Sequence, residues 1–314
     1  MDVQTIRNQD FFDHVLSGLS QTQKRIDSKW FYDEAGSQLF EEITRLPEYY
    51  PTRTEVAILS AQSARIANFV HANGALMELG SGASKKTRIL LDALPNLAAY
   101  VPMDISQSFL MTTAEILRAD YPALPISPQV ADFMQPLDIP VDVADMPKTA
   151  FFPGSTLGNL DLDQARDLLA RVRAVDRIDG FILGVDLVKD PETLVRAYDD
   201  AAGVTAAFNL NLLKRMNMEI AAGFDLDAFR HEARWNAAQS RIEMHLVSLK
   251  EQDVSVKDVW FHLKKGETIH TENSHKYTSA MIEELASASG WAVSEMLTDD
   301  KEWFGVFLLT PIRP

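Results

Sequence analysis

Three acidic residues stand within or at the end of short apolar segments, and the first of them precedes a pair of glycines. Glu78 lies in the segment "ALMEL", and Gly80 and Gly82 follow it closely. Asp104 and Asp132 close the segments "AAYVPMD" and "SPQVAD". Glycines after a strand let the backbone approach a ligand closely, and the helix start that follows favours negative charge. This arrangement is typical of a site that binds a nucleotide.

The glycine turn differs from that of dinucleotide-binding proteins. Those proteins have the pattern G-x-G-x-x-G, whereas residues 78–84 have E-x-G-x-G-x-S, with the acid first. An acid here suits a ligand without a pyrophosphate, such as S-adenosylmethionine, whose amino-acid end carries an ammonium group. Asp104 can bind both ribose hydroxyls, while Asp132 and Phe133 can contact the adenine. A nicotinamide-dependent oxidoreductase is the alternative, because Asp104 also stands where the ribose acid of such an enzyme lies.

The composition favours a small-molecule substrate. The 314 residues are 46% hydrophobic and 24% charged, which is ordinary for one large globular domain or two moderate ones. The absence of cysteine excludes disulfides, thiolate zinc sites and a cysteine nucleophile. A formal net charge of -15 disfavours binding to nucleic acid or to an anionic membrane. The N-terminus resembles no signal peptide, and no apolar run is long enough to span a bilayer, so we expect a cytoplasmic protein.

The order of elements indicates how these residues are positioned. Residues 4–71 have the pattern of helices broken by loops. From residue 75 onward five short strands, ending near residues 79, 105, 133, 155 and 187, alternate with helices. Ser106, Asp161 and Asp190 stand where helix caps are expected, the last followed by Pro191. The pattern predicts a parallel sheet with helices on both faces, extended by two strands at the C-terminal end.

Residues 200–275 interrupt the alternation. A helix is expected over 204–220, and residues 240–249 alternate, with Ile242, Met244 and Leu246 on one face. Residues 258–272 resemble a β-hairpin that turns at residues 264–267. Antiparallel strands within an α/β chain predict an inserted second unit.

Four longer segments of the sequence resemble segments of a known protein family. They are "KWFYDEAGSQLFEEITRLPEYYPTRTE" (29–55), "ELGSGASKKTR" (78–88), "FFPGSTLGN" (151–159) and "HTENSHKY" (270–277). In this order they resemble the L-histidine Nα-methyltransferases of ergothioneine biosynthesis, which belong to the class I S-adenosylmethionine-dependent methyltransferases and make trimethylhistidine, called hercynine. The likeness covers nearly the whole chain, and the first segment is the most specific.

The resemblance implies an α/β fold with two domains. A Rossmann-like class I methyltransferase core would contain residues 54–190 and 277–314. A smaller α+β substrate-binding domain would contain residues 1–53 and 191–276, with the substrate held between the two. We further expect a monomer.

The resemblance also implies the residues that bind histidine. Three would hold its carboxylate: Tyr49, Asn159 and Tyr198. Glu272 and Ser274 would bind the imidazole, with Met244 packed beside the ring. Tyr32 and Phe40 would lie near the amine, where aromatic faces stabilise the ammonium as it is methylated. This sequence has Asn273 between the two imidazole-binding residues, where variation alters the edge of the pocket.

The cofactor residues implied by the resemblance extend the glycine turn. Those that match the family are Gly80, Lys86, Asp104, Asp132 and Phe133, to which the turn itself adds Glu78 and Gly82. The methyl group would pass from the sulfonium to the neutral α-amine, with positioning as the main source of catalysis. Three transfers would require a pocket with room for two methyl groups beside Tyr32 and Phe40.

Three alternatives remain open on the sequence alone. In the first, the protein is a methyltransferase whose acceptor is another amino acid, such as tryptophan, or a small amine. In the second, it is the nicotinamide oxidoreductase described above. In the third, it binds a ligand without catalysing a reaction. A metal site at His270, Glu272 and His275 is also conceivable, but their spacing matches no zinc motif, and we expect no metal.

Overall fold

The computed structural model describes residues 3–82 and 85–313, and it divides the chain into two compact units. Unit 1 contains residues 1–50 and 189–274, and unit 2 contains residues 51–188 and 275–314. These boundaries lie within three residues of those expected from the sequence. Ser84, the last position of the E-x-G-x-G-x-S pattern, lies outside the described residues. No helix in the described ranges is long and apolar enough to cross a membrane.

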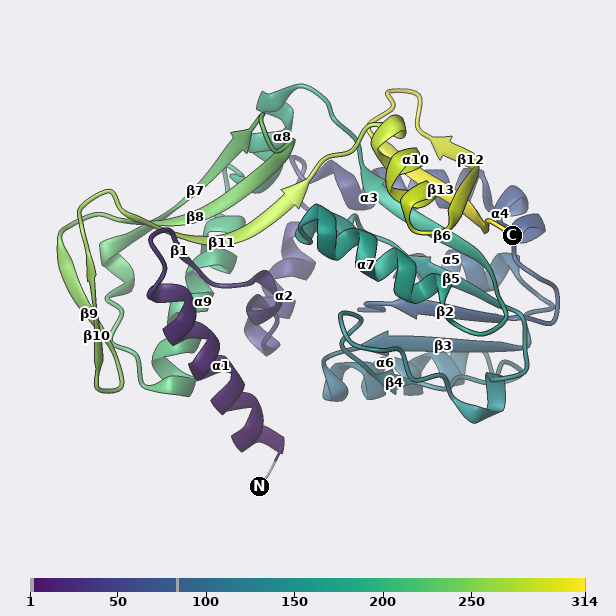
Figure 1. The fold of residues 1–314 in the computed structure, drawn as a ribbon, viewed down its shortest axis with the longest axis horizontal. Coiled ribbons are helices and arrows are strands. Elements are labelled where there is room, and N and C mark those ends of the chain that lie inside the picture. Colours follow the sequence, from purple (N-terminus) through teal and green to yellow (C-terminus); the bar gives the residue numbers. More distant parts are fainter. Residues whose placement is uncertain (1–2, 83–84, 314) are drawn as a thin grey trace. The chain divides into compact units, whose positions relative to one another are not determined.

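Unit 2 is built on a seven-stranded sheet with the order β12-β13-β6-β5-β2-β3-β4 (Figure 1). Its strands are β2 (Ala75–Leu79), β3 (Ala99–Asp104), β4 (Gln129–Val130), β5 (Lys148–Phe152), β6 (Ile178–Asp186), β12 (Trp291–Thr298) and β13 (Phe304–Pro311). Strands β2 to β6 are parallel, whereas β13 is antiparallel to both neighbours. The α/β fold with an antiparallel C-terminal pair is therefore confirmed.

Strand β2 marks the point where the strand order reverses, because β3 lies on one side of it and β5 on the other. In open α/β sheets, ligands bind beyond the carboxyl ends of the strands at this switch point. The glycine turn directly follows β2, so the topology places it where such a ligand is expected.

Helices cover both faces of this sheet (Figure 1). One buried cluster joins the sheet to α7 (Leu162–Arg173) and α10 (Ser279–Ala288). A second buried cluster joins its other face to α3 (Tyr50–Ala61), α4 (Ser63–Phe69), α5 (Lys85–Ala93) and α6 (Gln107–Asp120). Adjacent β2 residues divide between the clusters, with Met77 in the first and Leu76 in the second. This alternation follows from the pleat of a strand that is buried on both faces.

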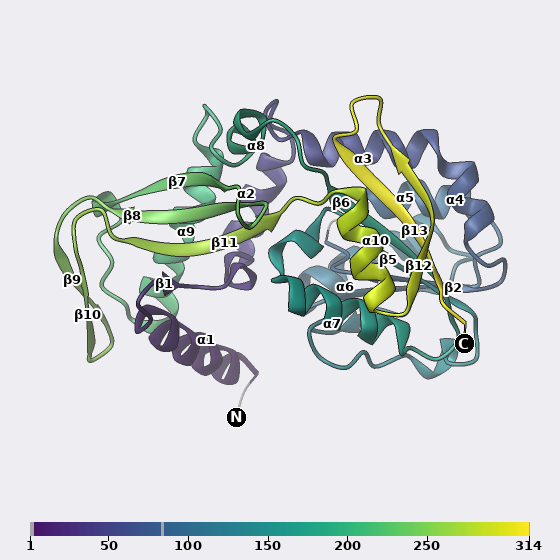
Figure 2. The same ribbon diagram turned by 45° about the horizontal axis from the view of Figure 1, so that its top comes forward.

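Unit 1 has a four-stranded sheet with the order β1-β11-β8-β7 and a separate two-stranded sheet. The strands of the larger sheet are β1 (Lys24–Arg25), β7 (Phe229–Asn236), β8 (Arg241–Ser248) and β11 (Thr268–His275), and the pair is β9 (Gln252–Val256) with β10 (Val259–Leu263). The helices of this unit are α1 (Val3–Leu19), α2 (Glu34–Ile43), α8 (Pro191–Tyr198) and α9 (Val204–Ile220). Helix α9 packs against β7 and β8, and α2 packs against α9 (Figure 2).

The hairpin expected over residues 258–272 is wrong. Strand β10 pairs with β9, and the tight connection between them contains Lys257 in the left-handed conformation. Residues 264–267 do turn, but they carry the chain to β11, which pairs with β8 and β1. Strands β9 and β10 are separated by fewer residues than β10 and β11, which favours their closure on entropic grounds.

The expected helix caps are mostly confirmed. Asp161 forms a capping box with Gln164, and Asp190 caps α8 with Pro191 at its first position. Ser106 occupies the N-cap position of α6, but its hydroxyl makes no capping hydrogen bond. Its backbone N–H instead donates to Asp104 at 2.9 Å, so the acid closes the connection between β3 and α6.

Candidate functional site

The glycine turn after β2 has the open backbone that a bound nucleotide needs. Gly80 and Gly82 have positive φ values of 69° and 48°, a region that residues with a side chain rarely adopt. The backbone N–H of Gly80 donates to the carbonyl of Met103 at 2.9 Å, which ties the turn to β3. A Cβ at Gly80 would meet the ring of Phe133 at 3.9 Å, and one at Gly82 would meet nothing within 4 Å. Both glycines are therefore required by conformation, and the backbone there is accessible.

Glu78 is an almost fully buried acid beneath this turn. Thr87 Oγ1 and Tyr100 OH both donate to its Oε2, each at 2.5 Å. Burial raises the pKa of the Glu78 carboxyl to about 7, and these two hydrogen bonds only partly offset that rise. A buried acid that titrates near neutral pH is stabilised in its charged form by a nearby cation. The ammonium group of S-adenosylmethionine is such a cation.

Asp104 holds the turn and the end of β3 together. Its Oδ2 accepts from the backbone N–H of Gly82 at 3.2 Å, and its Oδ1 accepts from that of Ser106 at 2.9 Å. Burial raises the pKa of this carboxyl above its ordinary value. A carboxylate retains further lone pairs after two such bonds, and they can accept from hydroxyl groups of a ligand.

Asp132 and Phe133 lie beyond the strand that was expected to end with them, because β4 stops at Val130. Asp132 Oδ1 accepts from the backbone N–H of Met134 at 2.8 Å, and Arg171 donates to the carbonyl of Phe133 at 2.9 Å. The Phe133 ring lies edge-to-face with Phe152, at 5.2 Å between centroids. The structure thus brings Phe133 and the glycine turn together and fixes the loop that carries Asp132.

Lys86 forms an ion pair that the sequence reasoning missed. Its Nζ lies 2.6 Å from Oε2 of Glu55, a fully buried residue of α3. The backbone N–H of Gly154 also donates to Glu55, at 2.9 Å from Oε2. A Cβ at Gly184 would stand 2.2 Å from Glu55 Oε1, so any side chain there would displace the Glu55 carboxylate. The missed signal was the spacing of Glu55 with the buried residues three and four positions later, which puts the acid on the apolar face of α3.

In unit 1 the structure gathers the aromatic residues that the resemblance singled out. Tyr32 contacts Phe40 edge-to-face at 5.7 Å between centroids, and Phe40 contacts Tyr49 at 6.2 Å. Tyr49 in turn lies 6.1 Å from Tyr198. Phe208 of α9, which sequence reasoning missed, packs against both Tyr32 and Phe40. Its only sequence signal is its place in the apolar pattern of α9.

The residues expected to bind the imidazole lie on β11. The Tyr198 hydroxyl is 2.7 Å from Ser274 Oγ, so Ser274 joins the aromatic group. Glu272 is partly buried two residues earlier, and His270 Nε2 donates to its carbonyl at 3.0 Å. Met244 is buried on the neighbouring strand β8, where its carbonyl is 3.1 Å from Thr271 Oγ1.

Asn159, the third predicted carboxylate ligand, belongs to unit 2. It ends a short 3₁₀ helix, Thr156–Asn159, that follows β5. The preceding Gly158 packs closely on the backbone of His275, where a Cβ would stand 2.8 Å from the carbonyl oxygen. The side chain of Asn159 is partly exposed, and its role as a histidine ligand stays a prediction.

Comparison with known proteins decides the family. The profile of the family described as "Histidine-specific methyltransferase, SAM-dependent" matches residues 11–311. The chain belongs to this family. The histidine N-alpha-methyltransferase of Mycobacterium tuberculosis is 44% identical over 94% of this chain and 92% of its own, and that of Mycolicibacterium smegmatis has the same identity and the same coverage. The 4-dimethylallyltryptophan N-methyltransferase of Aspergillus fumigatus is 25% identical over 88% of this chain and 87% of its own.

The cofactor of a histidine-specific methyltransferase fits the glycine turn. A buried acid at Glu78 opposes a pyrophosphate but stabilises an ammonium, and the accessible backbone at Gly80 permits close approach. Asp104 supplies an acceptor at the end of the next strand. The family therefore explains why the acid precedes the glycines, and it excludes the nicotinamide alternative.

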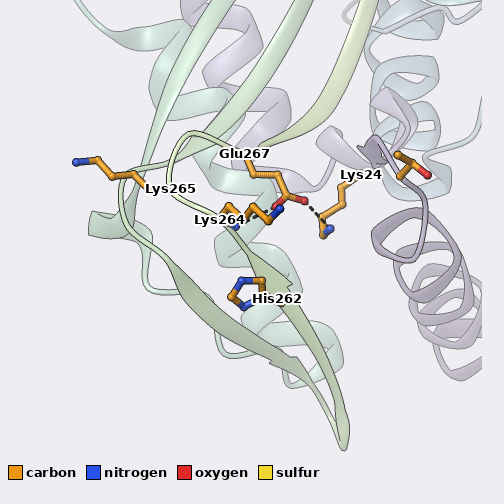
Figure 3. Close-up of a pocket in the computed structure, with 6 residues that line it drawn as sticks. Lys24, His262, Lys264, Lys265 and Glu267 are labelled. Atoms are coloured by element: carbon orange, nitrogen blue, oxygen red, sulfur yellow. Dashed lines mark hydrogen bonds and ion pairs between the residues drawn. The ribbon is translucent and has the colours of Figure 1, made fainter.

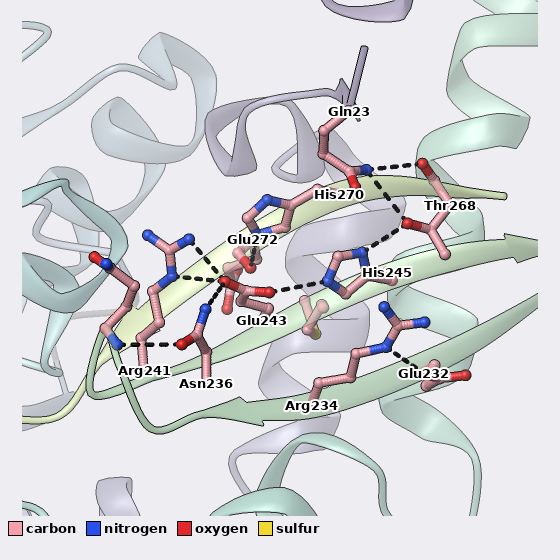
Figure 4. A network of polar contacts seen from close by, with 12 residues as sticks. Gln23, Glu232, Arg234, Asn236, Arg241, Glu243, His245, Thr268, His270 and Glu272 are labelled. Atoms are coloured by element: carbon pink, nitrogen blue, oxygen red, sulfur yellow. Dashed lines mark hydrogen bonds and ion pairs between the residues drawn. The ribbon is translucent and has the colours of Figure 1, made fainter. Parts of the chain in front are cut away.

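The trio His270, Glu272 and His275, which the sequence made conceivable as a metal site but not expected, is not among the groups of potential ligands in the described part of the chain, where another set of side chains lies together. Among the described residues, Glu243, His245 and His270 have potential ligand atoms within 4.8 Å of one another (Figure 4). Glu243 Oε1 already accepts from Arg241 and Asn236, at 2.8 and 2.9 Å. The two imidazoles stack with an interplanar angle of 17°, so they present faces rather than lone pairs to each other. This geometry favours a hydrogen-bonded network over a metal centre.

A surface hollow in unit 1 is lined by Thr22, Lys24, His262, Lys264, Lys265 and Glu267 (Figure 3). Glu267 binds the Lys24 ammonium at 2.6 Å and accepts from the backbone N–H of Lys264 at 2.9 Å. His262 Nδ1 lies within hydrogen-bonding distance of Asp253 Oδ1, at 2.9 Å. Acidic partners thus neutralise part of the positive charge, and the residues predicted to bind histidine lie elsewhere.

Replacing Glu78 by glutamine should stabilise the ligand-free protein at high pH. The folded-state pKa of Glu78 is about 7, against an ordinary value of 4.5, so the native protein holds a proton that the unfolded chain releases. The stability due to this proton is complete below pH 4.5 and is lost as the pH rises through 7. Above that pH we expect Glu78→Gln to gain about 3 kcal/mol at most.

Thermal unfolding of both proteins between pH 5 and pH 8 measures this effect. The two unfolding temperatures should diverge with rising pH, while binding of S-adenosylmethionine by the variant weakens. Glu283→Gln, on the exposed face of α10, is the matched control and should follow the wild type. Parallel pH profiles for wild type and Glu78→Gln would contradict the buried-acid assignment.

Proposed function

We propose that this protein transfers methyl groups from S-adenosylmethionine to the α-amine of L-histidine, and that three transfers yield hercynine, the trimethylated precursor of ergothioneine. The observation that carries the proposal is the 44% identity with histidine N-alpha-methyltransferases over 94% of the chain. Two proteins named ergothioneine biosynthesis protein 1, from Neurospora crassa and Schizosaccharomyces pombe, also match, at 28% and 27% identity.

Unit 2 would bind the methyl donor. Glu78 would pair with its ammonium group, and Asp104 would accept from the ribose hydroxyls. Asp132 would accept from the adenine amine, with Phe133 packed on the ring. Lys86 lies at the start of α5, and its ion pair with Glu55 would hold that part of the donor site in place. The donor supplies an electrophilic methyl group on a sulfonium, and it needs no further activation from the protein.

Unit 1 would bind the acceptor. Tyr49 and Tyr198 would donate to the histidine carboxylate, aided by Asn159. Neutral donors hold a carboxylate without a tight ion pair. Glu272 would accept from an imidazole N–H, and Ser274 would complete the ring contacts beside Met244.

Positioning would then supply most of the rate. The α-amine must lose its proton before it attacks, and none of the matched residues is a strong base. Tyr32 and Phe40 would line the region of the amine, where aromatic faces stabilise the ammonium that forms. Holding the reactants in an attack geometry lowers barriers by about 7–11 kcal/mol in favourable cases. Tyr32 would guide the departing proton to water.

A tryptophan derivative is the second acceptor class to weigh, because a 4-dimethylallyltryptophan N-methyltransferase is 25% identical to this chain. Glu272 argues for histidine. An imidazole has two ring nitrogens, so it can hydrogen-bond with both Glu272 and Ser274, whereas the single N–H of an indole can bind only one of them. We also propose that the protein acts as a cytoplasmic monomer without a metal ion, and sedimentation and metal analysis of the purified protein test the last two points.

Incubation with S-adenosylmethionine and a panel of amino acids tests the proposed function. We expect histidine to gain up to three methyl groups by mass, and tryptophan, phenylalanine and simple amines to gain none at equal concentration. Enzyme heated beyond unfolding is the control for non-enzymatic methylation. Methylation of tryptophan in preference to histidine would overturn the choice of acceptor, and no methylation of any amine would overturn the transferase activity itself.

A further inference from the structure

A chain of buried polar side chains connects β11, α9 and β7 to the end of α8 within unit 1. Thr271 Oγ1 donates to Asn209 Oδ1 at 2.8 Å. Asn209 Nδ2 lies 2.8 Å from His231 Nδ1, and His231 Nε2 lies 2.7 Å from the carbonyl oxygen of Tyr198. Exposure is 0% for Asn209, 1% for Thr271 and 8% for His231. Buried polar groups that satisfy one another in this way hold a single arrangement.

The chemistry of these groups gives the chain a direction. An amide nitrogen can only donate, so His231 Nδ1 must accept from Asn209. The ring proton of the neutral imidazole is then on Nε2, which donates to the Tyr198 carbonyl. Burial lowers the pKa of His231, which keeps the ring neutral near pH 7. Asn209 is itself oriented, because its Nδ2 also donates to the carbonyl of His245 at 3.2 Å.

Tyr198 is held at both ends by this arrangement. His231 binds its carbonyl, while Ser274 Oγ lies 2.7 Å from its hydroxyl. Tyr198 is the last residue of α8, and the cap residue that follows is not helical. Its carbonyl therefore belongs to a helix end, where orphan carbonyls take partners from outside the helix. The ring direction of Tyr198 depends on this backbone position.

We propose that His231, oriented by Asn209, is a positioning residue that sets Tyr198 for binding the carboxylate of the amino-acid substrate. The inference rests on the proposed function, since it assumes that Tyr198 binds histidine. His231 touches no substrate in this account. It acts through the backbone of Tyr198. The same series of hydrogen-bonded side chains begins at Thr271 on β11, the strand that carries Glu272 and Ser274, so it links Tyr198 to the residues proposed to bind the imidazole.

Three substitutions of His231 test the inference. His231→Leu and His231→Asn remove the contact with the Tyr198 carbonyl, the second because asparagine is too short to reach it. His231→Gln can place an N–H near the position of Nε2. We expect the first two to raise the KM for histidine about tenfold or more, with the KM for S-adenosylmethionine within about twofold of wild type. Glutamine should restore most of the loss.

His262→Leu is the matched control, because His262 is exposed on β10 and should leave both constants unchanged. Nitrogen-15 NMR of the wild-type imidazoles gives an independent reading, with His231 expected to carry its proton on Nε2. If the leucine variant does not fold, the asparagine variant and the NMR reading decide.

The outcomes separate this inference from the proposed function. A wild-type protein that methylates no histidine overturns the proposed function. A wild-type protein that methylates histidine, with an unchanged KM in folded His231→Asn, overturns the positioning role alone. A proton on Nδ1, or a glutamine variant as impaired as the asparagine variant, overturns it as well.

Discussion

Replacing Glu272 by alanine should raise the dissociation constant of histidine by about 30- to 150-fold, which corresponds to about 2–3 kcal/mol for a hydrogen bond to a charged group. The loss is expected to be this large because the carboxylate is the acceptor proposed for the imidazole N–H. Strand β11 holds Glu272 rigidly, since His270 binds its carbonyl at 3.0 Å and the adjacent Thr271 is bonded to Asn209 at 2.8 Å. In Glu272→Ala the imidazole N–H therefore loses its acceptor, and the rigid strand cannot shift to supply another one.

Calorimetry of both ligands measures this prediction. The affinity for S-adenosylmethionine should stay within about twofold of wild type. Glu251→Ala, which removes an exposed acid from the same unit, is the control for the change in charge. An unchanged histidine affinity in Glu272→Ala would rule out the imidazole role.

Replacing Asp104 by alanine should weaken S-adenosylmethionine binding by about 100-fold or more, because two charge-assisted hydrogen bonds to the ribose would be lost. The structure adds a second reason. The same carboxylate accepts from the backbone of Gly82 at 3.2 Å, so its removal also releases the glycine turn from β3. Asp104→Asn keeps one acceptor oxygen and should lie between the two.

Titration of S-adenosylmethionine by intrinsic fluorescence or calorimetry measures the loss. Asp167→Ala, on the exposed face of α7, is the control and should bind like the wild type. Histidine affinity measured without the donor should be unaffected by Asp104→Ala. Wild-type donor affinity in the alanine variant would contradict the proposed ribose contact.

Local patterns in the sequence predicted the local parts of the fold. The alternation of strands and helices after residue 75 is confirmed, as are the caps at Asp161 and Asp190. Each of these features depends on residues within a few positions of one another, which is the range that periodicity and capping rules cover.

Pairings between segments that are distant in the sequence could not be predicted from local sequence patterns. Strand β1 has two residues and pairs with β11, more than 240 positions later, and no local pattern indicates it. The ion pair of Glu55 with Lys86 and the chain from Thr271 to His231 are of the same kind. Such contacts depend on tertiary packing, which a single sequence encodes only through its whole fold.

The candidate site was predictable to a similar extent. The E-x-G-x-G pattern and the acids after later strands indicate the cofactor through residue types and local spacing. The aromatic group around Tyr49 was predicted by resemblance alone, because Tyr198 lies far along the sequence from Tyr32 and Phe40, and each of these rings also suits a packed core. The structure gathers these rings within unit 1, and their contact with histidine stays a prediction.

Identifying the nitrogen atom of histidine that receives the methyl groups is the most direct test of the proposed reaction. The reaction is run with histidine and S-adenosylmethionine carrying carbon-13 in its methyl group, and the product is studied by NMR. We predict that the labelled methyl protons correlate with the α-carbon of histidine, with up to three equivalent methyl groups on one nitrogen. Correlation with the carbons of the imidazole ring, or no labelled histidine at all, would contradict the account.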